Sequence, residues 1–384
     1  MQFKTIKMIP LAAALAFAFA GTASADDTVV KIGHVGPISG AIAHLGKDNE
    51  NGAIMAVDEL NAKGVVIGGK KVKIELLTED DAADPKQGTA AAQKLVDAKV
   101  NGVIGHLNSG TTIPASKIYH DAGIPQISPS ATNPKYTLQG FNTAFRVCAN
   151  DGQLGGTLGR YAVQVEKAKK VAVIDDATAY GQGVAAEFTK GAKSKAAGID
   201  VVATEHTTDK ATDFSAILTK IKAGNPDVIF FGGMDAVAGP MLRQMKTLGI
   251  KAKFMGGDGI CTEALATLAG DAMADGQVVC AEAGGVEDSG KAAMEAWREA
   301  YKKKFGIDVQ IYAPYVYDAV MTMVQAMKDA GSAEPAKYLP VLAKIKYKGI
   351  TGNIEFDKNG DMKDGTMTLY TYKGGKREVI AVTH

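Results

Sequence analysis

After residue 20 the sequence lacks any apolar run long enough to cross a membrane. The one long run, residues 9–20, stands at the very start. Lys4 and Lys7 precede this run, and the small residues Ala23-Ser24-Ala25 follow it. No acidic residue occurs before Asp26. This order is typical of a secretory signal peptide. We therefore expect residues 1–25 to be removed after Ala25 and the mature chain to reside in the periplasm, with no membrane span.

Charge of one sign is not in excess. The 43 Lys and Arg residues nearly balance 42 Asp and Glu residues, which gives a formal net charge of +1. Because residues 1–25 contain two lysines and no acid, the mature chain has a formal net charge of −1. This balance favours neither nucleic acid nor an anionic membrane surface as a partner.

Cysteine is scarce, with three residues in 384 and no C-x-x-C pair. No metal site is therefore indicated by the cysteines. Export permits disulfides, and Cys261 and Cys280 flank one predicted helical segment, so we expect them to pair. Cys148 would then be left over and buried. The alternative is three buried free thiols.

Catalytic and cofactor motifs are also missing. The six histidines show no metal-ligand spacing, and the sequence contains no G-x-S-x-G elbow and no Walker loop. Gly181-Gln182-Gly183 lacks the third glycine of a dinucleotide fingerprint. His106 reads as a packed residue at a strand end, and Ser109 has no evident base beside it. We therefore expect no catalytic residue, no metal and no cofactor.

Apolar strands alternate with amphipathic helices along the whole mature chain. This alternation first covers 29–128, from the strand 29–36 through the helices 47–63 and 85–98. It restarts at Lys170 and runs to the strand 277–280. Such patterns predict parallel sheets covered on both faces. With 359 residues after the signal peptide, we expect two doubly wound α/β lobes. Ligand sites in such sheets lie beyond the carboxyl ends of the strands.

Two clusters of hydroxyl groups follow neighbouring predicted strands. Gly105 to Thr112 contains Ser109 at the start of a helix, and Ser128 to Thr132 contains Ser130 and Thr132. Hydroxyl groups and free N–H groups at a helix start favour a carboxylate. Ordinary helix capping and a Ser-Pro turn are the alternatives. In the second run, Asp258 ends a glycine-rich strand and is suited to an ammonium group, unless it is a turn aspartate.

These segments resemble the periplasmic branched-chain amino-acid binding proteins, which bind leucine, isoleucine and valine for ABC transporters. The resemblance covers essentially the whole mature chain and rests on the order and spacing of several segments. They are 36–40, 51–53, 80–87, 103–109, 129–134, 180–183, 242–244 and 356–361.

The resemblance implies a type I periplasmic binding fold with three hinge crossings, near Val147, Cys280 and Leu369. The first lobe would comprise 26–147 and 281–368, and the second 148–280 and 369–384. The expected partners are a free amino acid and ABC transporter permease subunits, and we expect a monomer.

The resemblance also assigns roles within the site. It implies that Ser109, Ser130 and Thr132 hold the ligand carboxylate and part of its ammonium group, and that Asp258 pairs with the ammonium. Leu107, Tyr180 and Tyr312 match positions in the pocket wall. Leu45 and Met234 stand where some members carry aromatic residues, which leaves the side-chain preference open. Members with a disulfide in the first lobe have cysteines where this chain has Ala83 and Asn108.

Two other functions can be compared with the sequence. An enzyme on a Rossmann-like fold needs a nucleophile or a cofactor cradle that the sequence lacks. A sensor of another small amino acid or amide shares the fold and stays open as an alternative, whereas a DNA-binding regulator would carry a helix-turn-helix and no signal peptide.

Overall fold

The computed structural model describes residues 1–2, 28–195, 199–286 and 288–383. Apart from Met1 and Gln2, the predicted signal peptide lies outside the described residues. Among the helices that are described, none is both long and apolar enough to cross a membrane.

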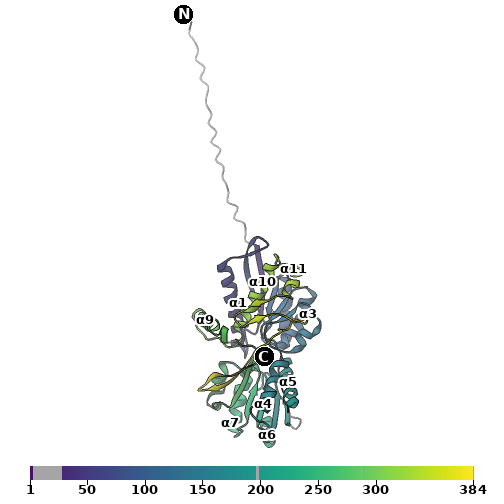
Figure 1. Cartoon of the computed structure of the whole chain (residues 1–384), viewed down its shortest axis with the longest axis vertical. Coiled ribbons are helices and arrows are strands. Elements are labelled where there is room, and N and C mark those ends of the chain that lie inside the picture. Colours follow the sequence, from purple (N-terminus) through teal and green to yellow (C-terminus); the bar gives the residue numbers. More distant parts are fainter. Residues whose placement is uncertain (3–27, 196–198, 287, 384) are drawn as a thin grey trace.

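The chain forms two α/β lobes, one above the other in Figure 1. The upper lobe is built on a six-stranded sheet of order β2-β3-β1-β4-β5-β6. Its strands are β1 (Thr28–Gly36), β2 (Val65–Ile67), β3 (Lys70–Asp80), β4 (Gly102–Gly105), β5 (Gln126–Ser128) and β6 (Ala144–Arg146). All neighbours pair in parallel except β2, which is antiparallel to β3.

The lower lobe is built on a seven-stranded sheet of order β15-β14-β11-β10-β9-β7-β8. Its strands are β7 (Lys170–Asp175), β8 (Asp200–His206), β9 (Val228–Gly232), β10 (Lys253–Gly256), β11 (Val278–Glu282), β14 (Met367–Lys373) and β15 (Lys376–Thr383). The strands β7 to β11 pair in parallel, and β14 and β15 add an antiparallel edge. The predicted α/β class with mainly parallel sheets is confirmed, and the antiparallel strands are an addition to it.

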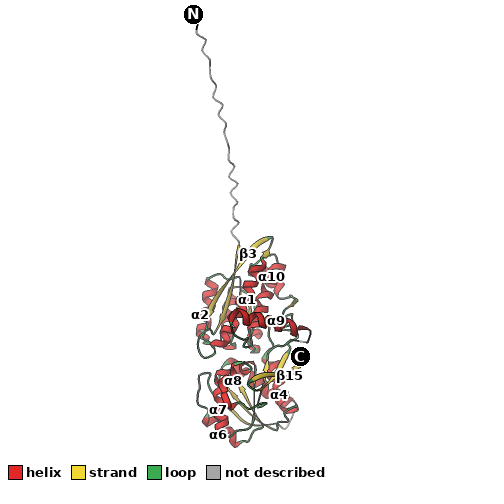
Figure 2. Cartoon of the chain, turned by 90° about the vertical axis from the view of Figure 1, so that its left-hand side faces the viewer, coloured by secondary structure: helices red, strands yellow, loops and turns green. Residues whose placement is uncertain are grey.

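Helices cover both sheets, as the turned view shows (Figure 2). The helices of the upper lobe are α1 (Ala43–Lys63), α2 (Pro85–Asp97), α3 (Ser109–Asp121), η1 (Pro134–Gln139), α9 (Asp288–Phe305), α10 (Ala313–Asp329) and α11 (Pro335–Leu342). Those of the lower lobe are α4 (Asp151–Gln164), α5 (Ala179–Lys195), α6 (Ser215–Ala223), α7 (Asp235–Thr247), η2 (Asp258–Ile260), α8 (Ala264–Ala269) and η3 (Gly270–Ala272). Between α11 and β14 the chain also forms a small hairpin of β12 (Tyr347–Lys348) and β13 (Asn353–Ile354).

Local sequence explains where several helices begin. The carboxylate of Asp84 accepts the N–H groups of Lys86 and Gln87, and Pro85 occupies the first turn of α2, as its sequence predicts. Asn150 and Gln153 form a reciprocal capping box at the start of α4. These caps fix helix starts at strand ends, which is where the ligand site is expected.

The chain passes between the sheets after β6, after β11 and before β14. The strand β11 continues to Glu282 and β14 begins at Met367, so Cys280 and Leu369 both lie within strands of the lower sheet. The two strands pair antiparallel, with Ala281 opposite Leu369. Two of the three connections therefore leave the lower sheet side by side.

The cysteine prediction is confirmed. Cys261 and Cys280 form a disulfide with a Cα–Cα distance of 5.3 Å, and Cys148 is a buried free thiol. Because Cys261 directly follows η2 and Cys280 lies in β11, the bond ties the turn that carries Asp258 to the sheet.

Candidate functional site

The three predicted hydroxyl groups lie where the upper sheet faces the lower lobe. Ser109 begins α3 after β4, and Ser130 and Thr132 follow β5. All three are buried, with exposures of 1%, 4% and 0%. Because β4 and β5 are parallel neighbours, their carboxyl ends bring the two loops together. The hydroxyl of Ser130 donates to the Leu107 carbonyl at 3.2 Å, which joins the loops directly.

The start of α3 carries no side-chain cap. Its N-cap residue is Asn108, whose side chain makes no capping bond. The Ser109 hydroxyl instead accepts the N–H of Asn133 at 3.2 Å. Within the described residues, the Thr132 hydroxyl oxygen has no partner within hydrogen-bond distance. An uncapped helix start beside buried hydroxyl groups is a favourable place for an anion.

A buried network holds this loop from behind. The His106 ring lies 3.0 Å from both an Asp81 oxygen and the Tyr119 hydroxyl, and all three residues are fully buried. The His106 carbonyl accepts the hydroxyls of Thr112 and Ser128 at 3.2 and 3.0 Å. His106 is therefore packed at the strand end, as expected, and it fixes the segment that leads into Leu107 and Ser109.

Asp258 approaches from the lower lobe. It begins η2 directly after β10 and is 1% exposed. One carboxylate oxygen accepts the Tyr312 hydroxyl at 3.0 Å, and the other has no partner among the described residues. Burial raises the pKa of Asp258 to about 6, although the nearby hydroxyl groups of Tyr180 and Tyr312 oppose the rise. A carboxylate held this way favours a positively charged partner.

Tyr312 comes from the other lobe and is itself fixed. It is the N-cap residue of α10 in the upper lobe. The Asp48 carboxylate on α1 accepts the N–H groups of four consecutive residues, 310–313. The bond from Tyr312 to Asp258 therefore spans the two lobes.

Asp151 is a site residue that sequence reasoning missed. It begins α4, is fully buried, and donates its N–H to the Thr132 carbonyl at 2.8 Å. Neither of its carboxylate oxygens has a hydrogen-bond partner by distance in the part of the chain described. Burial raises its pKa to about 8; the nearby Thr132 hydroxyl opposes the rise, and the charge of Asp258 adds to it. The signal in the sequence was the helix start Asn150-Asp151, directly after the first lobe crossing.

The predicted wall residues come together in one apolar cluster. Leu45, Leu107 and Tyr312 from the upper lobe and Tyr180 and Met234 from the lower lobe are each no more than 9% exposed. All five belong to a single hydrophobic cluster that crosses between the lobes. The Tyr180 hydroxyl accepts the Gly259 N–H at 3.0 Å, next to Asp258. The apolar wall thus adjoins the carboxylate.

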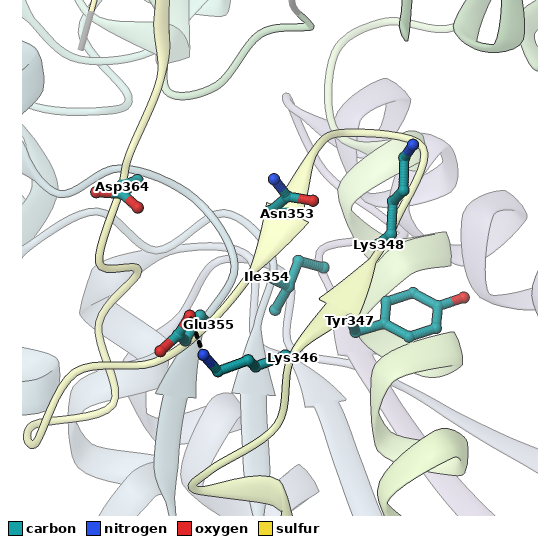
Figure 3. Close-up of a pocket in the computed structure, with 7 residues that line it drawn as sticks. All are labelled: Lys346, Tyr347, Lys348, Asn353, Ile354, Glu355 and Asp364. Carbon is teal, nitrogen blue, oxygen red and sulfur yellow. Dashed lines mark ion pairs between the residues drawn. The ribbon is translucent and has the colours of Figure 1, made fainter.

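Two cavities differ in whether predicted site residues line them. A cavity of about 610 Å³ opens between the lobes, lined by Ile42 and Asn108 from above and by Tyr180 and Met234 from below. Another, of about 340 Å³, lies over the β12–β13 hairpin (Figure 3). It contains none of the predicted site residues, and its Lys346 and Glu355 pair with each other at 3.7 Å. Of the predicted site residues, Tyr180 and Met234 line the cavity between the lobes, whereas the others are buried and do not line it. Because the Tyr180 hydroxyl also contacts the turn that carries Asp258, we take the cleft between the lobes as the candidate site.

The described residues contain no group of three or more His, Cys, Asp or Glu side chains placed to hold a metal ion.

Comparison with known proteins gives consistent relatives. An amino acid binding protein of Pseudomonas aeruginosa is 40% identical over 347 residues, which cover 89% of this chain and 90% of that protein. Leu/Ile/Val-binding protein homolog 1 of Brucella abortus is 39% identical, with 95% of each chain covered.

Solved structures agree. LivJ of Streptococcus pneumoniae, a branched-chain amino acid transporter substrate-binding protein in complex with isoleucine, has a TM-score of 0.82. It is 29% identical to this chain, and the match covers 92% of this chain and 99% of that one. The leucine binding protein LivK of Thermotoga maritima has a TM-score of 0.83 at 27% identity, with 92% and 98% covered. The family model described as periplasmic binding protein matches residues 29–376, so the chain belongs to the periplasmic binding protein family.

Proposed function

We propose that this protein captures a branched-chain or other apolar amino acid in the cleft between its lobes and delivers it to an ABC transporter. The observation that carries the proposal is a set of buried polar groups. The carboxylates of Asp258 and Asp151 lie close enough for their charges to interact, and Asp151 donates its N–H to Thr132, whose hydroxyl is buried like those of Ser109 and Ser130. The names of the relatives, which include Leu/Ile/Val-binding proteins, support the same ligand class.

The charges of a free amino acid match this arrangement. Its carboxylate binds the three hydroxyl groups and the start of α3, and its ammonium group binds Asp258 and Asp151. Burying either charge without a partner costs several kcal/mol. The ligand ammonium therefore offsets the burial of Asp258, and the protein donors offset the burial of the ligand carboxylate.

The ligand side chain then packs against the apolar wall of Leu45, Leu107, Tyr180, Met234 and Tyr312. Each buried methylene group adds about 0.8 kcal/mol. A dissociation constant near 1 μM corresponds to about −8 kcal/mol, and an aliphatic side chain supplies a useful share of it. The wall contains two aliphatic residues and one methionine beside its two tyrosines, which suits an aliphatic ligand.

Both lobes contribute to the site, so binding requires them to close. We propose that the lobes hinge at the three connections and that the closed form is the one that permease subunits recognise. In this proposal the chain works in the periplasm as a monomeric binding protein and not as an enzyme, with lobe boundaries near those expected from the sequence.

A thermal-shift screen of the twenty amino acids tests the ligand class, followed by calorimetry on those that raise the melting temperature. Ligands that bind only the folded state stabilise it by mass action. Leucine, isoleucine or valine should give the largest shifts. A flat result for all three, with a response to a different class of compound, would overturn the proposed ligand.

A further inference from the structure

A polar contact between His44 and Asp235 joins the lobes at the edge of the cleft. The Nε2 atom of His44 lies 2.7 Å from a carboxylate oxygen of Asp235. His44 is in α1 of the upper lobe, and Asp235 begins α7 of the lower lobe (Figure 1). Each is next in sequence to a wall residue, Leu45 and Met234. The contact therefore borders the proposed pocket.

The carboxylate in this pair is deeply buried. The Asp235 side chain is 0% exposed, whereas that of His44 is 28% exposed. The oxygen that meets His44 also accepts the Thr262 hydroxyl at 2.6 Å. Its other oxygen has no partner within the described ranges. Asp235 lies in the first turn of α7, which stabilises a negative charge without help from the other lobe.

We propose that His44 and Asp235 form a latch that holds the lobes closed over the ligand. This inference rests on the proposed function. Separation of the lobes breaks the contact, because its two halves belong to different lobes. The contact therefore stabilises the closed state relative to the open state and slows release of the ligand.

Other charged groups border this contact. On α1 itself, Lys47 pairs with Glu50 at 2.9 Å. Tyr372 of β14 is buried close to Asp235, and the charge of Asp235 contributes to the raised pKa of its hydroxyl. The cleft lined by Ile42 also presents Asp84, Asp176, Asp209 and Lys210. Since these charged groups also lie near the cleft, the contribution of the latch is measured as a difference between variants.

The chain offers a matched control. His206 Nδ1 lies 2.7 Å from an oxygen of Asp175, the same distance as in the latch. Both residues of this second pair belong to the lower lobe, on the neighbouring strands β8 and β7, and the His206 side chain is 61% exposed. Because both residues belong to one lobe, closure of the lobes neither forms nor breaks this contact.

The test is leucine affinity by calorimetry for the wild type, His44→Ala, Asp235→Asn and His206→Ala. We expect His44→Ala to weaken binding by at least about threefold, the scale of one hydrogen bond to a charged group. Asp235→Asn should weaken binding in the same direction from the other lobe, and His206→Ala should leave the affinity equal to that of the wild type.

Stopped-flow release of leucine gives a second readout. His44→Ala should speed dissociation by a similar factor. An affinity and a release rate equal to those of the wild type for His44→Ala, or equal changes in His206→Ala, would overturn the latch. The proposed function fails in a different way, namely when the wild type binds no leucine, isoleucine or valine.

Discussion

Asp258 concentrates the electrostatic argument in one side chain. Its carboxylate is buried, and one of its two oxygens has no hydrogen-bond donor among the described residues. Asp258→Ala should weaken amino-acid binding by at least about tenfold, since the ligand ammonium then loses its charged partner. Calorimetry with leucine measures the change.

A surface aspartate of the same lobe is the control for this substitution. Asp271 pairs with Lys246 at 2.9 Å, but its side chain is 92% exposed. Asp271→Ala should leave affinity unchanged. Equal affinity for Asp258→Ala and the wild type, with both folded by circular dichroism, would remove Asp258 from the site.

Asp151 gives the opposite signs for stability and binding. Its pKa in the fold, about 8, is above the ordinary value of 3.8. The folded chain therefore holds more protons than the unfolded chain between about pH 4 and 8, so stability falls as pH rises through that window. Asp151→Asn should raise the melting temperature of the ligand-free protein at pH 8 by about 2 to 4 °C, with little change at pH 5.

The same variant should bind leucine more weakly at pH 8, because the ammonium group loses its second carboxylate. Thermal melts at both pH values, with and without leucine, separate the two effects. A variant that is less stable than the wild type at pH 8 would show that Asp151 has a structural partner.

The sequence suggested candidate site residues only where a local pattern marked them. Asp258 stands in a glycine-rich strand end, and Ser109, Ser130 and Thr132 stand in hydroxyl-rich strand ends. Asp151 has no such neighbourhood, and its importance comes from burial, which depends on packing between distant segments. The latch was also invisible, since His44 and Asp235 are 191 residues apart.

Among the elements, the disulfide and the turn before it act together. Cys280 pairs in register with Gly256, the last residue of β10, and Cys261 follows η2. The bond closes a sequence separation of 19 residues around the Asp258 turn. It therefore restrains the unfolded chain and the site at once.

Replacing both Cys261 and Cys280 by alanine should lower the free energy of unfolding by roughly 2 to 4 kcal/mol, the usual effect for a loop of this size. Urea unfolding measures it. Cys148→Ala is the comparison, because it removes a buried thiol and no bond. Reducing agent should destabilise the wild type and Cys148→Ala, and leave the double variant unaffected.

Elements were predicted well where periodicity and caps agreed. The helix expected at 85–98 is Pro85–Asp97 because Asp84 caps it. The helix expected at 47–63 begins four residues earlier, at Ala43, without a side-chain cap to mark its start. The late strand β15 was missed although residues 379–382 form an apolar run. In the structure Val379, Ile380 and Val382 are exposed at the edge of the sheet.

At the scale of the whole molecule, the described structure has the lobes in contact. Tyr312 donates to Asp258, and the side chain of Asn133 donates to the Ala179 carbonyl at 2.6 Å. Ile42, Leu45 and Leu107 of the upper lobe share one apolar cluster with the lower lobe. The sequence predicts two lobes from two runs of strands and helices, but contacts between the lobes depend on how they close.

Closure should be visible in the overall size of the protein. If the ligand charges hold the lobes together, leucine should lower the radius of gyration measured by small-angle scattering, because it shifts a hinge equilibrium toward the compact form. Asp258→Ala should show little compaction at a leucine concentration that saturates the wild type, and Asp271→Ala should compact fully. The same radius for the wild type with and without bound leucine would mean that the lobes meet before the ligand arrives. The cleft would then be preformed, and the energy of closure would play no part in binding.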